Sequence, residues 1–245
     1  MNPPRILDKK GLKSCIFVAF VRGGLRLLRA LLYFCGYNDA KRYIMIKNII
    51  FDWGGVLIHL DKQRCTEAFA KYGVVVSDEL TNPYGQRADL MDFEKGLMTV
   101  EEFHETVRRI YAPTLSDEQI DEAWSALLLG IPEYKLDKLL QLKERYRLFL
   151  LSNTNAVHWR VGRKCFDYKG HKAEDYFDQI FLSHEIHELK PTAEAFLKVA
   201  QLAGIKPEET LFVDDLQVSC DAAAALGFHT YCPPANTDWF ANYEL

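Results

Sequence analysis

The sequence contains no uninterrupted hydrophobic segment long enough to span a membrane, which takes about 20 mostly apolar residues. The apolar run at residues 15–21 is short, and Arg26 and Arg29 interrupt the next one at residues 25–34. Glycine and proline are also few, with 14 and 9 in 245 residues, which excludes a collagen-like or low-complexity chain. The composition that remains, 49% hydrophobic and 26% charged, is that of a globular protein with room for one large domain or two small ones.

The chain also lacks the excess of positive charge that nucleic-acid-binding proteins use. Its formal net charge is −4, so we expect no nucleic-acid partner. None of its six cysteines forms a Cys-x-x-Cys pair, and their spacing matches no zinc module. We interpret them as free thiols in a reducing compartment, which predicts a cytoplasmic protein. No feature of the sequence specifies an oligomeric state.

Residues 1–44 differ in charge from the rest of the chain. The first 45 residues carry nine basic and two acidic side chains, whereas the remainder carries 21 and 32. Met45 directly precedes a predicted strand, so we separate residues 1–44 as an N-terminal extension. Three interpretations of this extension stay open: sequence translated from an upstream start, a targeting or membrane-surface segment, or a helix packed on the domain.

Short apolar runs alternate with helical stretches from Met45 onward, a pattern typical of parallel βαβ units. The candidate strands are 47–51, 147–151, 179–182, 210–213 and 228–231. The candidate helices are 133–145, 191–203 with Pro191 at its first position, and 217–226 with Gly227 as its cap. We therefore predict an α/β fold, with a Rossmann-like parallel sheet and helices on both faces.

Residues 61–130 interrupt this alternation, because they contain several helix signals and no convincing strand. The segment 99–102, Thr-Val-Glu-Glu, has the pattern of a capping box, and Ser116 opens a second helix. Apolar residues follow both starts at helical spacing. We predict a small helical domain at 61–130, inserted into a core domain made of residues 45–60 and 131–245.

Polar groups stand at or just beyond the ends of the predicted strands, at the edge where open parallel sheets bind ligands. Asp52 follows the first strand, and Gly54 and Gly55 after it allow a tight loop and close backbone approach to a ligand. Ser152 and Asn153 follow the second strand, where a hydroxyl and free backbone N–H groups suit an oxyanion or a phosphate. Each group alone is also consistent with a turn or a helix cap.

Charged groups complete this set. Lys190 precedes a predicted helix and could neutralise a phosphate, although a lone lysine there is usually a surface group. Asp214 and Asp215 follow the strand 210–213. Adjacent carboxylates at a buried strand end repel each other and favour a bound cation, and oxygen ligands indicate Mg²⁺.

In their order and context, the four sites resemble the motifs of the haloacid dehalogenase-like hydrolase superfamily. The resembling segments are 50–57, 150–155, 189–191, and 212–215 together with 225–227. The segments 93–96 and 101–103 also resemble the helical cap of its phosphatase branch. The resemblance extends from residue 45 to about residue 231.

The resemblance implies Mg²⁺-dependent hydrolysis of a small phosphomonoester, for example a sugar phosphate, through an aspartyl-phosphate intermediate. It assigns Asp52 as the nucleophile and Lys190 as the group that neutralises charge on nucleophile and phosphate. Ser152 and Asn153 would hold phosphoryl oxygens. The implied metal ligands are Asp52, the Gly54 carbonyl, Asp214 and, through water or a hydrogen bond, Asp215.

Gly54 departs from the pattern of many such phosphatases, which carry a second Asp at this position as general acid and base. General acid catalysis is typically worth ~10²–10⁴-fold. Two alternatives therefore stay open. One is a 2-haloacid dehalogenase, against which the paired Asp214 and Asp215 argue, and the other is a non-catalytic phosphate-binding relative.

Overall fold

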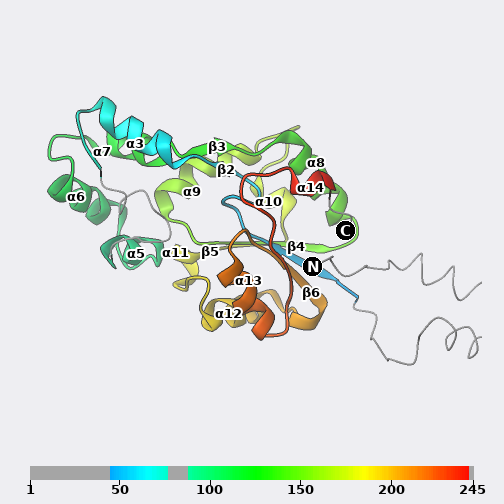
Figure 1. Ribbon diagram of the computed structural model, residues 1–245. Coiled ribbons are helices and arrows are strands. Elements are labelled where there is room, and N and C mark those ends of the chain that lie inside the picture. Colours follow the sequence, from blue (N-terminus) through cyan, green and yellow to red (C-terminus); the bar gives the residue numbers. More distant parts are fainter. Residues whose placement is uncertain (1–44, 77–87, 243–245) are drawn as a thin grey trace, which may run out of the picture. The chain divides into compact units, whose positions relative to one another are not determined.

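The computed structural model describes residues 45–76 and 88–242 (Figure 1). The described residues from Lys47 onward belong to one compact unit. The predicted N-terminal extension, residues 1–44, lies outside the described residues. Within the described ranges, no helix is long and apolar enough to cross a membrane.

A five-stranded parallel sheet forms the centre of the α/β core, as the alternating pattern predicts. In spatial order its strands are β5 (Gln179–Leu182), β4 (Arg147–Ser152), β1 (Asn48–Phe51), β6 (Thr210–Val213) and β7 (His229–Tyr231). Each predicted strand is confirmed to within one residue at either end. The central strand β1 is buried along its whole length and pairs with β4 and β6. Phe51 lies opposite Leu150 and Val213, so the residues that follow these strands emerge at one edge of the sheet.

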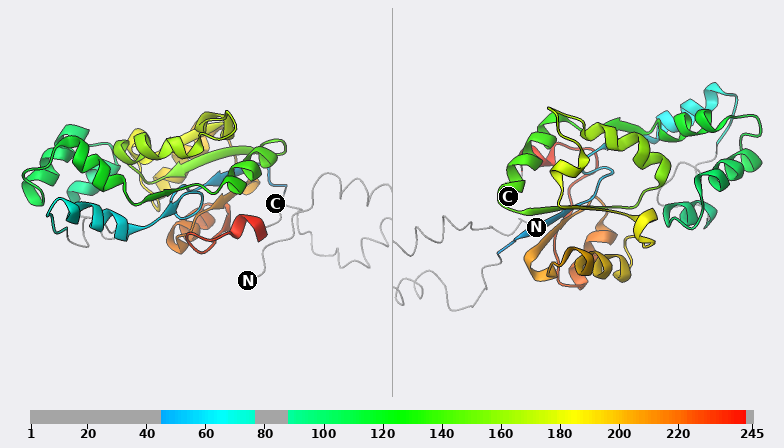
Figure 2. Two further views of the ribbon diagram at one scale, coloured as in Figure 1. Left: turned by 90° about the horizontal axis from the view of Figure 1, so that it is seen from above. Right: turned by 180° about the vertical axis from the view of Figure 1, so that it is seen from behind.

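Helices cover both faces of this sheet (Figures 1 and 2). One face carries α12 (Ala193–Ala203) and α13 (Gln217–Ala225), and the other carries α8 (Glu133–Lys143), α9 (Ala156–Gly162) and α10 (Ala173–Tyr176). The shorter elements are η1 (Arg163–Phe166), α11 (Ser183–Ile186), η2 (Pro207–Glu209) and α14 (Trp239–Asn242). Strand periodicity directs neighbouring side chains to opposite faces. Ile50 packs in the cluster of α12 and α13, whereas Phe51 meets Phe240 of α14 edge-on at 5.5 Å between ring centroids.

The predicted start of the helix at Pro191 is wrong by two residues. Helix α12 begins at Ala193, and Thr192 is its N-cap, with Oγ1 accepting a hydrogen bond from the Ala195 N–H at 3.3 Å. A hydroxyl at the N-cap satisfies one of the free N–H groups of the first turn, which a proline cannot do. The predicted end of α13 is confirmed, because Gly227 follows the cap residue Leu226 in the left-handed region at φ 93°.

In its described residues, the helical insert contains α3 (Lys62–Lys71), α5 (Ala88–Glu94), α6 (Val100–Ile110) and α7 (Asp117–Ser125). The predicted capping box of α6 pairs Thr99 with Glu102, and Ser116 caps α7 in the same way. These helices share a hydrophobic cluster, in which Phe93 and Phe103 stack at 4.3 Å between ring centroids.

The expectation of no strand in the insert needs one correction. The structure contains a short antiparallel pair, β2 (His59–Leu60) and β3 (Leu128–Gly130), where the chain leaves the core and returns to it. Elements of two and three residues are too short to show an alternating pattern.

Candidate active site

Asp52 and Asp214 come together because the strands that precede them are neighbours. Asp52 follows β1 and Asp214 follows β6, and the Asp52 N–H donates to the Val213 carbonyl at 2.8 Å. Both residues are buried, with 8% and 0% of their surface exposed. A pair of carboxylates this deep in the protein requires a compensating positive charge.

Lys190 supplies that charge. Its Nζ lies 2.7 Å from Asp52 Oδ1 and 2.6 Å from Asp214 Oδ2. Burial lowers the pKa of Lys190, but Asp214 and Asp52 raise it by more, so it lies above its usual value and the side chain stays charged. Burial raises the pKa of Asp52, with Asp214 and Asp215 adding to the rise and Lys190 opposing it. One ammonium group is therefore shared by two buried carboxylates.

Asp215 adds a third carboxylate to this centre. Oxygens of Asp52, Asp214 and Asp215 all lie within 4.8 Å of one another. Burial and the neighbouring Asp214 raise the pKa of Asp215 to about 6. Three carboxylates beside a single lysine leave excess negative charge, and hard oxygen donors at this spacing fit a magnesium ion. The donor set is thus suited to the predicted metal.

Gly55 is required where the loop after Asp52 passes Asp215. Its φ of 73° lies in the left-handed region, and a Cβ at this position would come 2.7 Å from Asp215 Oδ2. The glycine that the sequence suggested for close backbone approach therefore makes room for a candidate metal ligand.

Ser152 and Asn153 lie where β4 ends, beside the end of β1. Ser152 is buried, whereas Asn153 is exposed. The Asn153 carboxamide is bound to Lys190 twice, accepting from its backbone N–H at 2.9 Å and donating to its carbonyl at 2.8 Å. Sequence reasoning missed this contact, because 37 residues separate the pair and no local pattern reports it. Asn153 thereby holds the segment that presents the Lys190 ammonium group.

Two histidines near the site take structural roles. His158 stacks on Trp124 of the insert, and its Nε2 lies 3.0 Å from the Trp124 carbonyl oxygen. Burial lowers the pKa of His158 to about 4, so the ring is neutral. His184 Nδ1 lies 3.1 Å from the Thr154 carbonyl oxygen. His158 therefore packs against the insert.

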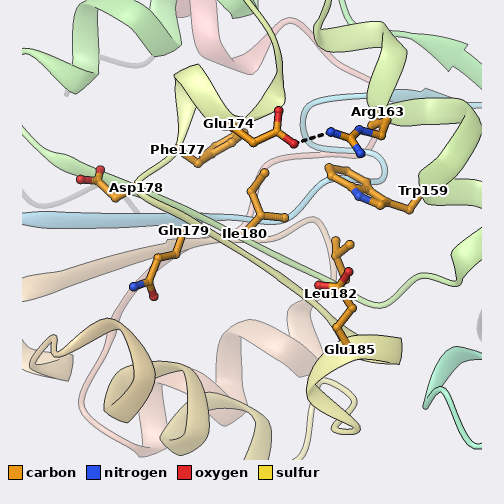
Figure 3. Close-up of a pocket in the computed structure, with 9 residues that line it drawn as sticks. All are labelled: Trp159, Arg163, Glu174, Phe177, Asp178, Gln179, Ile180, Leu182 and Glu185. Atoms are coloured by element: carbon orange, nitrogen blue, oxygen red, sulfur yellow. Dashed lines mark hydrogen bonds and ion pairs between the residues drawn. The ribbon is translucent and has the colours of Figure 1, made fainter.

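A separate cavity of about 280 Å³ lies along the edge strand β5. Trp159 forms one wall, and an ion pair between Arg163 and Glu174 closes another (Figure 3). None of its lining residues belongs to the candidate site, so this cavity is distinct from the cluster around Asp52.

Comparison with known proteins identifies the family. The model of the haloacid dehalogenase-like hydrolases matches residues 46–227. This chain belongs to that family. The match includes all the site residues described above and ends before α14.

One curated protein and two solved structures illustrate what this haloacid dehalogenase-like hydrolase is similar to. A D-ribitol-5-phosphate phosphatase of Bacteroides thetaiotaomicron is 33% identical over 197 residues, which cover 80% of this chain and 95% of that protein. A family enzyme of the same organism, solved with magnesium and inorganic phosphate, has a TM-score of 0.74 at 43% identity and covers 81% and 100% of the two chains. A protein from Porphyromonas gingivalis, described as a predicted hydrolase of the family, has a TM-score of 0.73 at 37% identity, and the match covers 81% of this chain and 96% of that one.

Proposed function

We propose that this haloacid dehalogenase-like hydrolase is a magnesium-dependent phosphatase whose substrate is a small sugar phosphate or sugar-alcohol phosphate. The observation that carries the proposal is the buried group in which Lys190 bridges Asp52 and Asp214, with Asp215 beside them. Relatives add support, since one is a D-ribitol-5-phosphate phosphatase and another was solved with magnesium and phosphate.

In this proposal Asp52 is the nucleophile. One carboxylate oxygen attacks phosphorus in line, the bond to the leaving alkoxide breaks, and water then hydrolyses the aspartyl-phosphate. Lys190 neutralises charge on the nucleophile and on the transferring phosphoryl group. Ser152 binds a phosphoryl oxygen through its hydroxyl. Since the Asn153 side chain is bound to Lys190, its backbone N–H is the group available to phosphate. Phosphoryl transfer asks the protein mainly for positioning and charge stabilisation, which these groups provide.

Asp52, Asp214 and Asp215, together with the Gly54 carbonyl, are the proposed metal ligands. A bound Mg²⁺ would supply positive charge to the phosphoryl oxygens. This donor set distinguishes the proposal from a 2-haloacid dehalogenase, which uses the same aspartate on carbon without a metal.

Gly54 has no side chain that could protonate the leaving alkoxide, whereas many related phosphatases have an acid at this position. A Cβ at this position would already lie 3.0 Å from Leu60 Cδ1, so a longer side chain would require Leu60 to move. We expect the enzyme to favour phosphate esters whose alcohols leave readily or to be slower than relatives with an acid here.

We further propose that the helical insert is the cap that selects the substrate. It contacts the core through α7 and α9, where His158 stacks on Trp124 and Arg160 pairs with Asp121. A second contact brings the turn after α5 against α11, where a Cβ on Gly96 would lie 2.0 Å from the His184 carbonyl oxygen. A cytoplasmic location also stays part of the proposal, on the basis of the free cysteines Cys65, Cys165, Cys220 and Cys232.

A panel of phosphorylated metabolites, assayed with Mg²⁺ and with EDTA, tests this function. We expect Mg²⁺-dependent release of phosphate, with D-ribitol 5-phosphate and related five-carbon phosphates among the better substrates. Release of halide from 2-haloacids without metal would favour the dehalogenase. The absence of turnover on every phosphomonoester would favour the non-catalytic relative.

Replacing Asp214 with Asn should raise the Mg²⁺ concentration needed for half-maximal activity and lower the activity at saturation. The change removes one carboxylate from the proposed metal site and one of the two partners of Lys190. Titration of activity against Mg²⁺ measures both effects. The half-buried Asp137, which pairs with Lys169, provides a control, since Asp137→Asn makes the same chemical change away from the site. An unchanged Mg²⁺ requirement in Asp214→Asn would contradict the metal assignment.

A chain that starts at residue 45 should retain the phosphatase activity of the full chain. All proposed site residues lie beyond Met45, and the family match begins at residue 46. Turnover and melting temperature of residues 45–245, compared with the full chain, measure the effect. A shortened protein that melts many degrees lower would show that residues 1–44 stabilise the domain.

A further inference from the structure

Asn236 lies beyond the end of the family match, yet it binds the loop that follows the nucleophile. Its carboxamide pairs with both backbone groups of Leu60, accepting from the N–H at 2.9 Å and donating to the carbonyl at 3.0 Å. Its own backbone N–H donates to the Gly55 carbonyl at 2.8 Å. One residue of the C-terminal segment thus holds both ends of the loop segment 55–60, which leads from the nucleophile into β2.

The middle of this loop is held by two further side chains. The Val56 carbonyl accepts from Lys135 Nζ at 2.7 Å and from Trp239 Nε1 at 3.2 Å. Lys135 is fully buried, and its Nζ also lies 3.4 Å from the Leu57 carbonyl oxygen. Four backbone carbonyls of the segment 55–60 are therefore bound by side-chain or backbone donors from α8 and the C-terminal segment.

The two ends of the loop serve different parts of the protein. The Gly55 end passes Asp215 in the catalytic centre. The Leu60 end belongs to β2, which pairs with β3, so this strand pair joins the helical insert to the core. The Asn236 backbone binds the first end and its side chain binds the second.

We infer that Asn236 is a positioning residue, whose carboxamide fixes β2 and thereby sets where the insert lies over a bound substrate. This inference rests on the proposed phosphatase function. The side chain acts in place of a neighbouring strand, because it supplies a donor and an acceptor to the same residue of β2. Its φ of 57° lies in the left-handed region, which Asn tolerates better than most residues.

The variant Asn236→Gly separates the backbone contact with Gly55 from the side-chain contacts with Leu60. Glycine adopts the same φ without strain and keeps the backbone N–H that binds Gly55, but it removes both bonds to Leu60. Asn236 is exposed, so the variant leaves the hydrophobic core intact. Asn236→Asp is the conservative variant, since it keeps the acceptor for the Leu60 N–H and loses the donor. Thr237→Ala is the matched control, because the Thr237 hydroxyl donates to the nearby Pro234 carbonyl and not to the loop.

The test compares KM and kcat on two substrates of different size. For D-ribitol 5-phosphate we expect Asn236→Gly to raise KM about 3- to 10-fold, the usual effect of losing hydrogen bonds of this kind. For acetyl phosphate, which is too small to require the insert, we expect less than about a 2-fold change. The Mg²⁺ requirement should stay unchanged, since the Gly55 contact remains. Asn236→Asp should fall between Asn236→Gly and the wild type, and Thr237→Ala should match the wild type.

If Asn236→Gly changes KM equally for both substrates, or for neither, the inference is overturned. Hydrogen exchange of the free proteins gives a second readout that needs no activity. Asn236→Gly should lose protection in residues 58–61 and 127–130 while β1 and β6 keep theirs. If the wild type hydrolyses no phosphomonoester, the proposed function fails, and this exchange pattern alone decides whether Asn236 fixes β2. Unchanged protection in these segments would refute its positioning role.

Discussion

Replacing Asp52 with Asn is expected to abolish phosphatase turnover while the protein stays folded. The substitution keeps the volume of the side chain and removes the carboxylate that attacks phosphorus. Loss of a catalytic nucleophile commonly lowers kcat by ~10³-fold or more. The fold should tolerate the change, because Lys190 keeps its contact with Asp214 at 2.6 Å and one of three crowded carboxylates is neutralised.

Steady-state rates on the best substrate of the panel measure the turnover. Circular dichroism and thermal melting of the same samples show whether the protein stays folded. The variant Asp137→Asn, at a half-buried position on α8, controls for the chemical change itself. A variant that keeps more than a few per cent of wild-type turnover would show that Asp52 is not the nucleophile. Loss of turnover together with loss of the folded state would mean that Asp52 is needed for stability instead.

The sheet and the relative order of the site residues could be predicted because their signals are local. Each strand is a short apolar run, and each functional group follows such a run directly. Parallel pairing then brings the ends of β1, β4 and β6 to one edge without further information. The helices α6 and α7 of the insert are predictable for the same reason, since the capping residues Thr99 and Ser116 directly precede them.

The parts that sequence could not predict depend on partners far apart in the chain. Asn153 binds Lys190 across 37 residues, and Asn236 binds Leu60 across 176. From the local sequence alone, an asparagine at either position is interpreted as a turn or cap residue. The pair β2 and β3 was missed for a related reason, because its pairing spans the whole insert and its strands are too short for a periodic pattern. The pairing of Lys190 with both Asp52 and Asp214 is likewise known only once the spatial order of the strands is known.

Replacing Lys190 with Met should have the largest combined effect on activity and stability. Met keeps much of the length of the side chain and removes its charge, so Asp52 and Asp214 lose the cation that lies 2.7 and 2.6 Å from them. Breaking a buried ion pair by removing one partner typically costs about 3–5 kcal/mol of stability. Turnover should fall by at least ~10²-fold, because the positive charge beside the phosphoryl group is lost as well.

Magnesium should recover part of the stability that Lys190→Met loses. A ligand that binds only the folded protein stabilises it in proportion to its affinity, and carboxylates without a lysine partner should hold the cation more tightly. We therefore expect Mg²⁺ to raise the melting temperature of the variant by more than that of the wild type. Lys47→Met is the matched control, since the Lys47 side chain is half exposed and its pair with Glu209 at 2.7 Å is worth only about 0–1 kcal/mol. Equal shifts with Mg²⁺ in all three proteins would show that Lys190 and the metal do not share these carboxylates.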